Sequence, residues 1–272
     1  MAVISDQEFK QLAEYIQKHY GIYLKNEKKT LVAGRLQHVL ADQNFKSFTE
    51  YFEYLVNDKT KKASTILMNK ITTNHTFFMR EVDHFHFFRD QVLPYLKATI
   101  TDKDLRVWSA GCSTGEEPYT LSMIINDFFG EEKVWWDTKI LATDISERVL
   151  QIAKTGTYSN EQIAAIPTMW KLNYFKKLNG ETQQLIHKIQ NEIIFRKFNL
   201  VDSTFPFKKK FHVIFCRNVM IYFDTHAKND LVNRFYEYLE PGGYLFIGHS
   251  ESLNRDSTKF KYVMPAVYRR ES

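Results

Sequence analysis

The sequence has 272 residues, of which 44% are hydrophobic and 15% aromatic, and its formal net charge is +5. This length allows one large domain or two unequal ones, with enough apolar residues for a substantial core. Two cysteines cannot form a disulfide framework, which indicates a reducing compartment. No signal peptide pattern is visible and no apolar run reaches the length of a membrane span, so we expect a cytoplasmic protein. The modest positive charge favours an acidic partner without identifying nucleic acid.

Residues 1–72 are predicted to form an all-helical domain. Ser5 with Glu8, and Ser47 with Glu50, match the capping box that begins a helix, and a second helix is expected from about Glu27. Eleven basic and eight acidic residues give this region a charge of +3, most of the excess of the whole chain. This basic surface is either simply solvated or a docking face for an acidic partner.

The rest of the chain reads as a linker followed by an α/β domain. Residues 73–100 predict an aromatic, polar connection and a helix, and from Leu105 strands alternate with helices, which predicts a mostly parallel sheet. The stretch 105–118 predicts a strand, a tight turn at Gly111 and Gly115, and a helix that begins near Pro118. In a doubly wound sheet this unit places a small ligand at a helix N-terminus.

Further strands are predicted at 139–143, 193–198, 211–216 and 244–248, with a closing pair at 260–263 and 266–269. The segment 168–192 interrupts this alternation. Its Asn179-Gly180 pair is a hairpin signal between apolar segments at 172–178 and 185–189, so we expect a small antiparallel insertion there. Thr225 is expected to cap a helix that ends before Pro241-Gly242-Gly243.

The charge of the glycine turn narrows the choice of ligand. A phosphate loop requires Gly-Lys-Ser/Thr, but this turn has no lysine, and Glu116 and Glu117 would repel a pyrophosphate. S-adenosylmethionine carries a sulfonium and an ammonium group and no phosphate, so it suits these carboxylates better than NAD or ATP. Asp144 ends the second strand and is placed to accept hydrogen bonds from ribose hydroxyls. The alternatives are that the glutamates only favour the helix dipole and that Asp144 caps a local turn.

Polar residues follow four predicted strands, at 111–117, 144, 199–200 and 217–222, and the carboxyl ends of these strands face one crevice. The motifs that contain them are Thr-Thr-Asn-His-Thr-Phe-Phe-Met-Arg-Glu (72–81), Trp-Ser-Ala-Gly-Cys-Ser-Thr-Gly-Glu-Glu-Pro-Tyr (108–119), Ala-Thr-Asp-Ile-Ser (142–146) and Phe-Cys-Arg-Asn-Val-Met-Ile-Tyr-Phe (215–223). With these motifs, and over nearly its whole length, the sequence resembles the chemotaxis receptor methyltransferases, the CheR family.

The resemblance implies a Rossmann-like, S-adenosylmethionine-dependent methyltransferase with a mostly parallel seven-stranded sheet. It implies a helical domain at 1–72 for receptor docking, a linker and helix at 73–100 that contribute to the cofactor site, and a methyltransferase domain at 101–272 with the β insertion at 168–192. The implied reaction methylates glutamate side chains of transmembrane chemoreceptors and leaves S-adenosylhomocysteine. The residues implied to contact the cofactor are Asn74, Thr76, Arg80, Gly111, Glu117, Asp144, Asn199, Leu200, Arg217 and Asn218.

The resemblance also places Arg80 and Tyr222 near the reacting groups. A glutamate carboxylate is ionised at pH 7, so the reaction needs no general base, only exclusion of water and alignment of the reactants. Arg80 would hold the carboxylate and Tyr222 would orient it. The alternatives are a structural ion pair for Arg80 and a core position for Tyr222.

The expected partner is the cytoplasmic helical region of chemoreceptors, met by a monomer that does not insert into the membrane. Lys28 and Arg35 are seven residues apart and share one face of the second helix, which we expect to dock the acidic receptor helix. The competing expectations are that these charges are only solvated, or that the insertion at 168–192 performs all the docking.

Other classes of site are disfavoured by the sequence. His84 and His86 lie two apart on a helix with no third metal ligand evident, and His249-Ser250-Glu251 lacks a nucleophile elbow. A nucleic-acid methyltransferase remains an alternative, although the base-amine motif Asn/Asp-Pro-Pro-aromatic is absent after the fourth strand. A non-enzymatic, cofactor-binding sensor is the other alternative.

Overall fold

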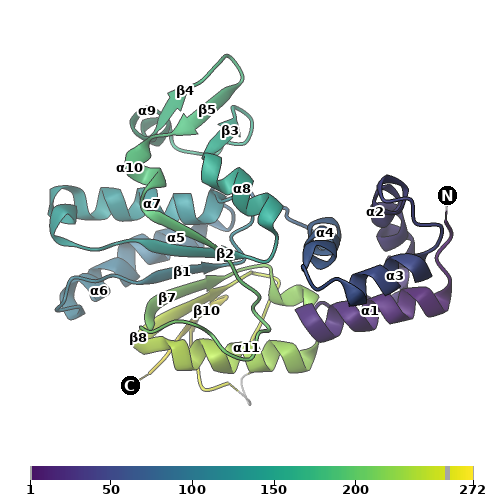
Figure 1. Ribbon diagram of the computed structural model, residues 1–272. Coiled ribbons are helices and arrows are strands. Elements are labelled where there is room, and N and C mark those ends of the chain that lie inside the picture. The colour runs from purple at the N-terminus through teal and green to yellow at the C-terminus, as the bar shows by residue number, and fades with distance from the viewer. Residues whose placement is uncertain (1, 255–257, 272) are drawn as a thin grey trace.

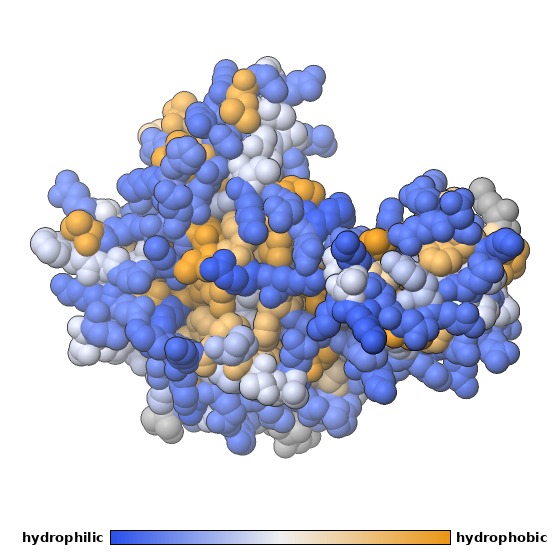
Figure 2. Space-filling view, in the orientation of Figure 1, coloured by the Kyte–Doolittle hydropathy of each residue, from blue (hydrophilic) through white to orange (hydrophobic). Residues whose placement is uncertain are grey.

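The computed structural model describes residues 2–254 and 258–271. A large lobe is built around a seven-stranded sheet, and a smaller, all-helical lobe stands beside it (Figure 1). In the same view, hydrophilic residues cover most of the surface, and hydrophobic residues gather over the middle of the large lobe (Figure 2). Within the described ranges, no helix combines the length and apolarity needed to cross a bilayer.

The helical lobe packs around its own apolar core, to which Ile16, Leu36 and Leu67 belong. Its helices are α1 (Asp6–Tyr20), α2 (Lys29–Asp42), α3 (Phe48–Asn57) and α4 (Lys62–Ile71). The capping box at Ser5 and Glu8 is complete, as predicted. The one predicted at Ser47 forms only half, because the Glu50 carboxylate accepts the Lys46 N–H instead of that of Ser47. The second helix begins at Lys29, since Asn26–Lys28 form a 3-10 turn.

A continuous helical segment joins this lobe to the sheet. It consists of α5 (Val82–Phe87), a π-helical turn at Phe88–Val92 and α6 (Leu93–Thr99). Phe85 and Phe88 both pack against Phe215 in the centre of the sheet. The segment is therefore part of the large core, and it holds the preceding residues 73–81 against the sheet.

The strands follow the order β6-β2-β1-β7-β8-β10-β9. The first five are parallel, β10 is antiparallel to β8, and β9 is antiparallel to β10. Their bounds are β1 (Val107–Ala110), β2 (Ile140–Asp144), β6 (Ile193–Lys197), β7 (Phe211–Cys216), β8 (Leu239–Ile247), β9 (Lys261–Met264) and β10 (Val267–Arg269). Strand β1 lies between β2 and β7, where the strand order reverses. A doubly wound sheet binds ligands at such a position, beyond the carboxyl ends of the strands.

Both faces of the sheet are covered by helices. Helices α5, α6, α7 (Glu116–Phe129) and α8 (Glu147–Thr155) contribute to the core that contains Val107, whereas α11 (Thr225–Tyr238) packs on the core that contains Trp108 (Figure 1). The near-continuous apolar composition of the strands follows from this double burial. The cap of α11 is Asp224 rather than the predicted Thr225, and β8 already begins at Leu239 and includes the Pro-Gly-Gly segment.

The predicted antiparallel insertion is present but has three strands. They are β3 (Thr157–Ser159), β4 (Phe175–Lys177) and β5 (Thr182–Leu185), in the order β3-β5-β4, with α9 (Thr168–Tyr174) and α10 (His187–Gln190) beside them. Strand β3 precedes the expected range 168–192. The predicted apolar segments 172–178 and 185–189 are only partly strands, because α9 takes the start of the first and α10 most of the second.

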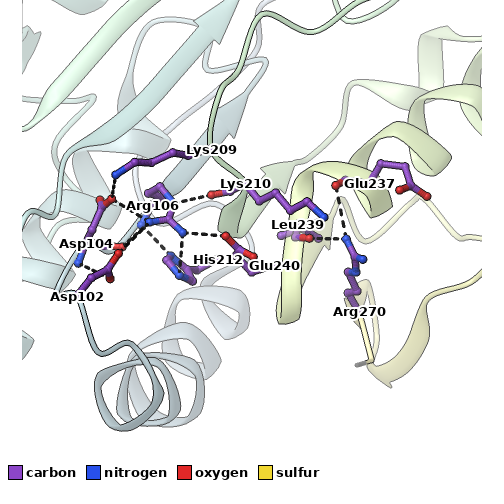
Figure 3. A network of polar contacts seen from close by, with 10 residues as sticks. All are labelled: Asp102, Asp104, Arg106, Lys209, Lys210, His212, Glu237, Leu239, Glu240 and Arg270. Carbon is purple, nitrogen blue, oxygen red and sulfur yellow. Dashed lines mark hydrogen bonds and ion pairs between the residues drawn. The ribbon is translucent and has the colours of Figure 1, made fainter.

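Charged residues fix the edge of the sheet where its strands begin (Figure 3). The Arg106 guanidinium donates to Asp104 at 2.8 Å, to Glu240 at 2.9 Å and to the Lys210 carbonyl at 2.5 Å. This side chain therefore ties together the starts of β1, β7 and β8, and His212 accepts the Arg106 N–H at 3.1 Å. At the opposite ends of the parallel strands, their carboxyl ends, the sheet borders a cavity.

Candidate active site

A strand, a tight turn and a helix form the centre of the site, as the sequence predicts. Strand β1 ends at Ala110, and α7 begins at Glu116. Gly111 has φ of +89°, and a Cβ there would lie 2.4 Å from Cγ2 of Val219. Only glycine allows the turn to approach the loop after β7 this closely.

A cavity of about 230 Å³ lies between this turn and the helical lobe. The structure brings every residue expected at the site to its lining. They are Lys28, Arg35, Asn74, Thr76, Arg80, Gly111, Glu117, Asp144, Asn199, Leu200, Arg217, Asn218 and Tyr222. The cavity therefore has one wall from the ends of the strands, one from the linker and one from the helical lobe.

The two glutamates of the turn do not act together. The Glu116 side chain is buried and accepts the Thr114 hydroxyl at 2.7 Å, away from the cavity, while Glu117 lines it. Successive residues of a helix point about 100° apart, which separates them. Of the two carboxylates, only Glu117 is therefore placed to repel a phosphate in the cavity. Burial raises the pKa of Glu117, and the adjacent Arg217 guanidinium opposes that rise.

Arg217 is held between two carboxylates. Its side chain is 3% exposed, and its guanidinium lies 3.1 Å from oxygens of both Glu117 and Glu81 and also donates to the Arg80 carbonyl. Glu81 also accepts the Asn218 side-chain amide at 3.2 Å. Glu81 is a site residue that the sequence patterns do not single out, and its place directly after Arg80 is the only signal for it. The charge of Arg217 is thus largely balanced by protein groups.

Asp144 was expected either to bind ribose hydroxyls or to cap a local turn, and its position allows both. Its carboxylate accepts the backbone N–H groups of Ser113 and Ser146, each at 2.9 Å, so it shapes the turns after β1 and β2. It also lines the cavity. Burial raises the pKa of Asp144, and these N–H groups oppose the rise. Each carboxylate oxygen can accept more than one hydrogen bond, so ribose hydroxyls remain compatible with both backbone contacts.

Arg80 does not form the structural ion pair, and Tyr222 does not occupy the core position, that were the alternatives to a role at the site. Arg80 donates to the His75 carbonyl at 2.8 Å and lies over the Phe77 ring, and none of the ion pairs between described residues includes it. Tyr222 is 37% exposed and so is not a core residue. Both side chains line the cavity, where a cation and a phenol face the space between the lobes.

The remaining expected residues make structural contacts at the cavity wall. Asn199 donates to the His19 carbonyl of the helical lobe at 2.9 Å, and Leu200 is buried. The Asn74 carbonyl accepts the Ser113 hydroxyl at 3.1 Å, which fixes the linker to the glycine turn. Thr76 adjoins this segment. These contacts place the linker between the two lobes.

Lys28 and Arg35 differ in whether their charged groups are bonded within the protein. Arg35 donates to the Ile71 carbonyl at 2.6 Å and to the Thr73 hydroxyl at 3.2 Å, so its guanidinium fastens α2 to the linker. Lys28 is exposed at the end of the 3-10 turn, just before α2 rather than within it. The pair therefore does not form a single free basic face on one helix, although both residues line the cavity.

The helical lobe is joined to the loop after β7 through the backbone. Ile22 pairs with Phe223 in an antiparallel bridge, and the Tyr23 N–H donates to the Tyr222 carbonyl at 2.8 Å. A Gln17 amide donates to Asp224 at 2.7 Å beside them. The segment that carries Tyr222 is therefore part of the contact between the lobes.

A histidine that the sequence analysis considered as a metal ligand does have two possible co-ligands. Ligand atoms of Glu81, His84 and His249 lie within 4.8 Å of one another, which corrects the statement that no third ligand is evident. However, the Arg217 guanidinium is 3.1 Å from the same Glu81 carboxylate. A dication would be repelled by that charge. The Arg217 guanidinium therefore already occupies the position beside the Glu81 carboxylate that a metal ion would take.

The cavity lies at the position where a doubly wound sheet binds its ligand, and the family models identify the class of protein as an S-adenosylmethionine-dependent methyltransferase. Residues 74–268 match the family model described as CheR methyltransferase, SAM binding domain, and residues 7–72 match the CheR methyltransferase, all-alpha domain. The chain belongs to the CheR methyltransferase family.

Relatives named as chemotaxis protein methyltransferases match over nearly the whole chain. One from Borreliella burgdorferi is 41% identical and covers 98% of this chain and 95% of its own. Cher2 from Pseudomonas putida is 34% identical and covers 91% and 90%, and the Escherichia coli relative is 32% identical and covers 97% and 91%.

Proposed function

We propose that this protein transfers the methyl group of S-adenosylmethionine to glutamate side chains of the cytoplasmic helical region of chemoreceptors, in the adaptation of chemotaxis. The observation that carries the proposal is a cation without an ion-pair partner among the described residues, Arg80, in a cavity between a cofactor wall and a basic helical lobe. A glutamate carboxylate that enters this space would meet Arg80 and Tyr222.

The residues of the large lobe fit the cofactor by charge. Asp144 would accept hydrogen bonds from ribose hydroxyls. Glu117 and Glu81 share the single positive charge of Arg217, so this wall keeps a net negative charge that would attract a cationic group of the cofactor, and the turn has no lysine to attract phosphate. When bound, S-adenosylmethionine supplies a methyl group on a sulfonium. Asn74, Thr76, Asn199, Leu200, Arg217 and Asn218 would complete the binding wall.

The protein has little proton chemistry to perform. A carboxylate is already ionised at pH 7, and its hydration is what weakens it as a nucleophile. Arg80 would replace part of that hydration and hold one oxygen, while Tyr222 would donate a hydrogen bond that sets the direction of the other. Catalysis would then come from positioning in a site that excludes water.

The helical lobe provides the docking surface in this proposal. At the cavity, Lys28 adds a free positive charge, and exposed Tyr23 and Leu31 add apolar surface. The rim of the cavity thus suits an amphipathic helix that presents a glutamate. Arg35 has a supporting role, since its donors are used within the protein.

The decisive test is incubation of the protein with labelled S-adenosylmethionine and a receptor cytoplasmic fragment, followed by alkaline release of labelled methanol. Alkali-labile label is expected on the fragment and absent when the receptor glutamates are replaced by glutamine. Lys28→Glu should raise the KM for receptor, more at low salt than at high salt, because exposed charges are screened over about 8 Å at physiological ionic strength. Lys10→Glu makes the same charge change away from the cavity and is the matched control.

Two results would overturn the proposal. Alkali-stable label would indicate methylation of a different group, such as an amine. No transfer, with normal binding of S-adenosylhomocysteine measured by calorimetry, would indicate a sensor rather than an enzyme for this substrate. Unchanged receptor kinetics of Lys28→Glu at all salt concentrations would remove only the docking assignment.

A further inference from the structure

The loop after β7 carries Arg217, Asn218 and Tyr222, which line the cavity together with Val219 and Phe223, and it has an irregular backbone. Asn218 lies in the left-handed region with φ of 59°, and a single 3-10 turn follows at Met220–Tyr222. The N–H groups at the start of so short a turn have no helical acceptors. Their acceptor has to come from another part of the chain.

Glu251 supplies that acceptor. It follows β8, and its carboxylate accepts the N–H groups of Asn218 at 3.0 Å and Ile221 at 3.2 Å, as well as that of Gly248 at 2.5 Å. The side chain is buried and does not belong to the cavity lining. One carboxylate therefore ties together the loops that follow two neighbouring parallel strands, from behind the site.

Two further observations show how closely the loops depend on each other. A Cβ at Gly248 would lie 2.4 Å from the Asn218 side-chain nitrogen and 2.8 Å from its backbone nitrogen. Burial raises the pKa of Glu251, and the N–H groups that point at its oxygens, including that of Met220, oppose the rise. Each identified partner of the carboxylate is a donor, so the site requires acceptor oxygens and not merely a polar group of the same size.

We infer that Glu251 is a positioning residue of the methyltransferase site, because its carboxylate fixes the loop at 217–222 in the shape that presents Asn218 and Tyr222 to the cavity. This inference goes beyond the proposed function, since it holds whichever carboxylate-bearing protein is methylated. It also gives a role to Glu251 of the His-Ser-Glu segment at 249–251.

The test is Glu251→Gln, which keeps the size of the side chain but replaces one acceptor oxygen with a donor that faces N–H groups. Affinity for S-adenosylhomocysteine, measured by calorimetry, should fall on the order of ten- to hundred-fold, as expected for a lost charged hydrogen bond and a new donor–donor contact. Turnover at saturating cofactor and receptor should fall as well, since Tyr222 shares the loop. Glu237→Gln, an exposed glutamate outside the cavity, is the matched control and should behave as wild type.

A double-mutant cycle with Asn218→Ala distinguishes positioning from general destabilisation. If Glu251 acts through the loop, Asn218→Ala should have little further effect on affinity once Glu251→Gln is present. Additive effects, or wild-type affinity and turnover in Glu251→Gln, would overturn the inference. If Glu251→Gln fails to fold, Glu251→Asp keeps the charge with a shorter reach, and the same cycle is measured with it.

Discussion

Asp144→Asn is the most informative single change at the cofactor wall. The carboxylate makes two buried backbone hydrogen bonds at 2.9 Å and lines the cavity, so its removal would affect both the fold and the ligand. Asparagine keeps the shape and one acceptor oxygen but presents a donor in place of the other. The two consequences can then be measured separately.

The magnitudes follow from the number of hydrogen bonds at stake. One backbone N–H, of Ser113 or Ser146, would face the new amide donor, which should lower the free energy of unfolding by about 1–3 kcal/mol. The loss of an ionised acceptor for ribose hydroxyls should weaken binding by about 1.5–3 kcal/mol, a factor of roughly 10 to 150. Asn retains one acceptor, so the lower half of that range is expected.

The assays are urea unfolding of the free protein and calorimetric titration with S-adenosylhomocysteine. Thr157→Ala, which changes a small polar side chain in the insertion rather than at the cavity, is a control for handling and folding. Unchanged affinity in a folded Asp144→Asn protein would refute the ribose assignment and leave Asp144 as a turn residue. Loss of affinity with no loss of stability would instead refute the claim that its backbone contacts matter to the fold.

Three further outcomes are expected. Arg80→Ala should lower turnover at saturating substrates by more than its effect on S-adenosylhomocysteine affinity explains, and normal turnover would make Arg80 structural. Burial, with the nearby Arg217, lowers the pKa of His84 to about 4, below the unfolded value near 6.5, so stability should be lost as the pH falls from 6.5 towards 4, by up to about 3 kcal/mol. Urea unfolding across this range should show a shallower dependence in His84→Phe, and an identical slope would contradict the linkage. Gly111→Ala should destabilise the protein by about 1–3 kcal/mol, because φ of +89° and the 2.4 Å approach to Val219 are both incompatible with a Cβ, and Val219→Ala should relieve only the second cost.

The elements that the sequence predicted correctly depend on local signals. The strand, turn and helix around Gly111 and the complete capping box at Ser5 can be recognised within about ten residues, because each rests on backbone requirements of its own. The closing pair of strands and the hairpin signal at Asn179-Gly180 are of the same kind. Strand β3 was missed because three residues after a helix-ending glycine are too few to show alternation.

The parts of the site that could not be predicted are set by contacts across the fold. Nothing near Glu251 or Glu81 in the sequence indicates that their carboxylates meet the loop at 217–222, thirty or more residues away for Glu251 and more than a hundred for Glu81. The different directions of Glu116 and Glu117 depend on where α7 begins, which sequence patterns locate only to within a few residues. Arg35 looked like a free charge because its acceptors lie on a different helix and linker.

The backbone bridge between residues 22–23 and 222–223 sets a rule for the construction of chimaeras. If the helical lobe docks the receptor, as proposed above, an exchange of helical domains between relatives would redirect the enzyme towards other receptors. A junction placed only at the linker would replace residues 22–23, so the bond to the Tyr222 carbonyl would depend on the backbone path of the transplanted segment. A shift of that path would leave the Tyr222 carbonyl without this N–H and would loosen the segment that carries the phenol. A graft that retains residues 17–24 of the host should preserve turnover while it changes the receptor that is recognised.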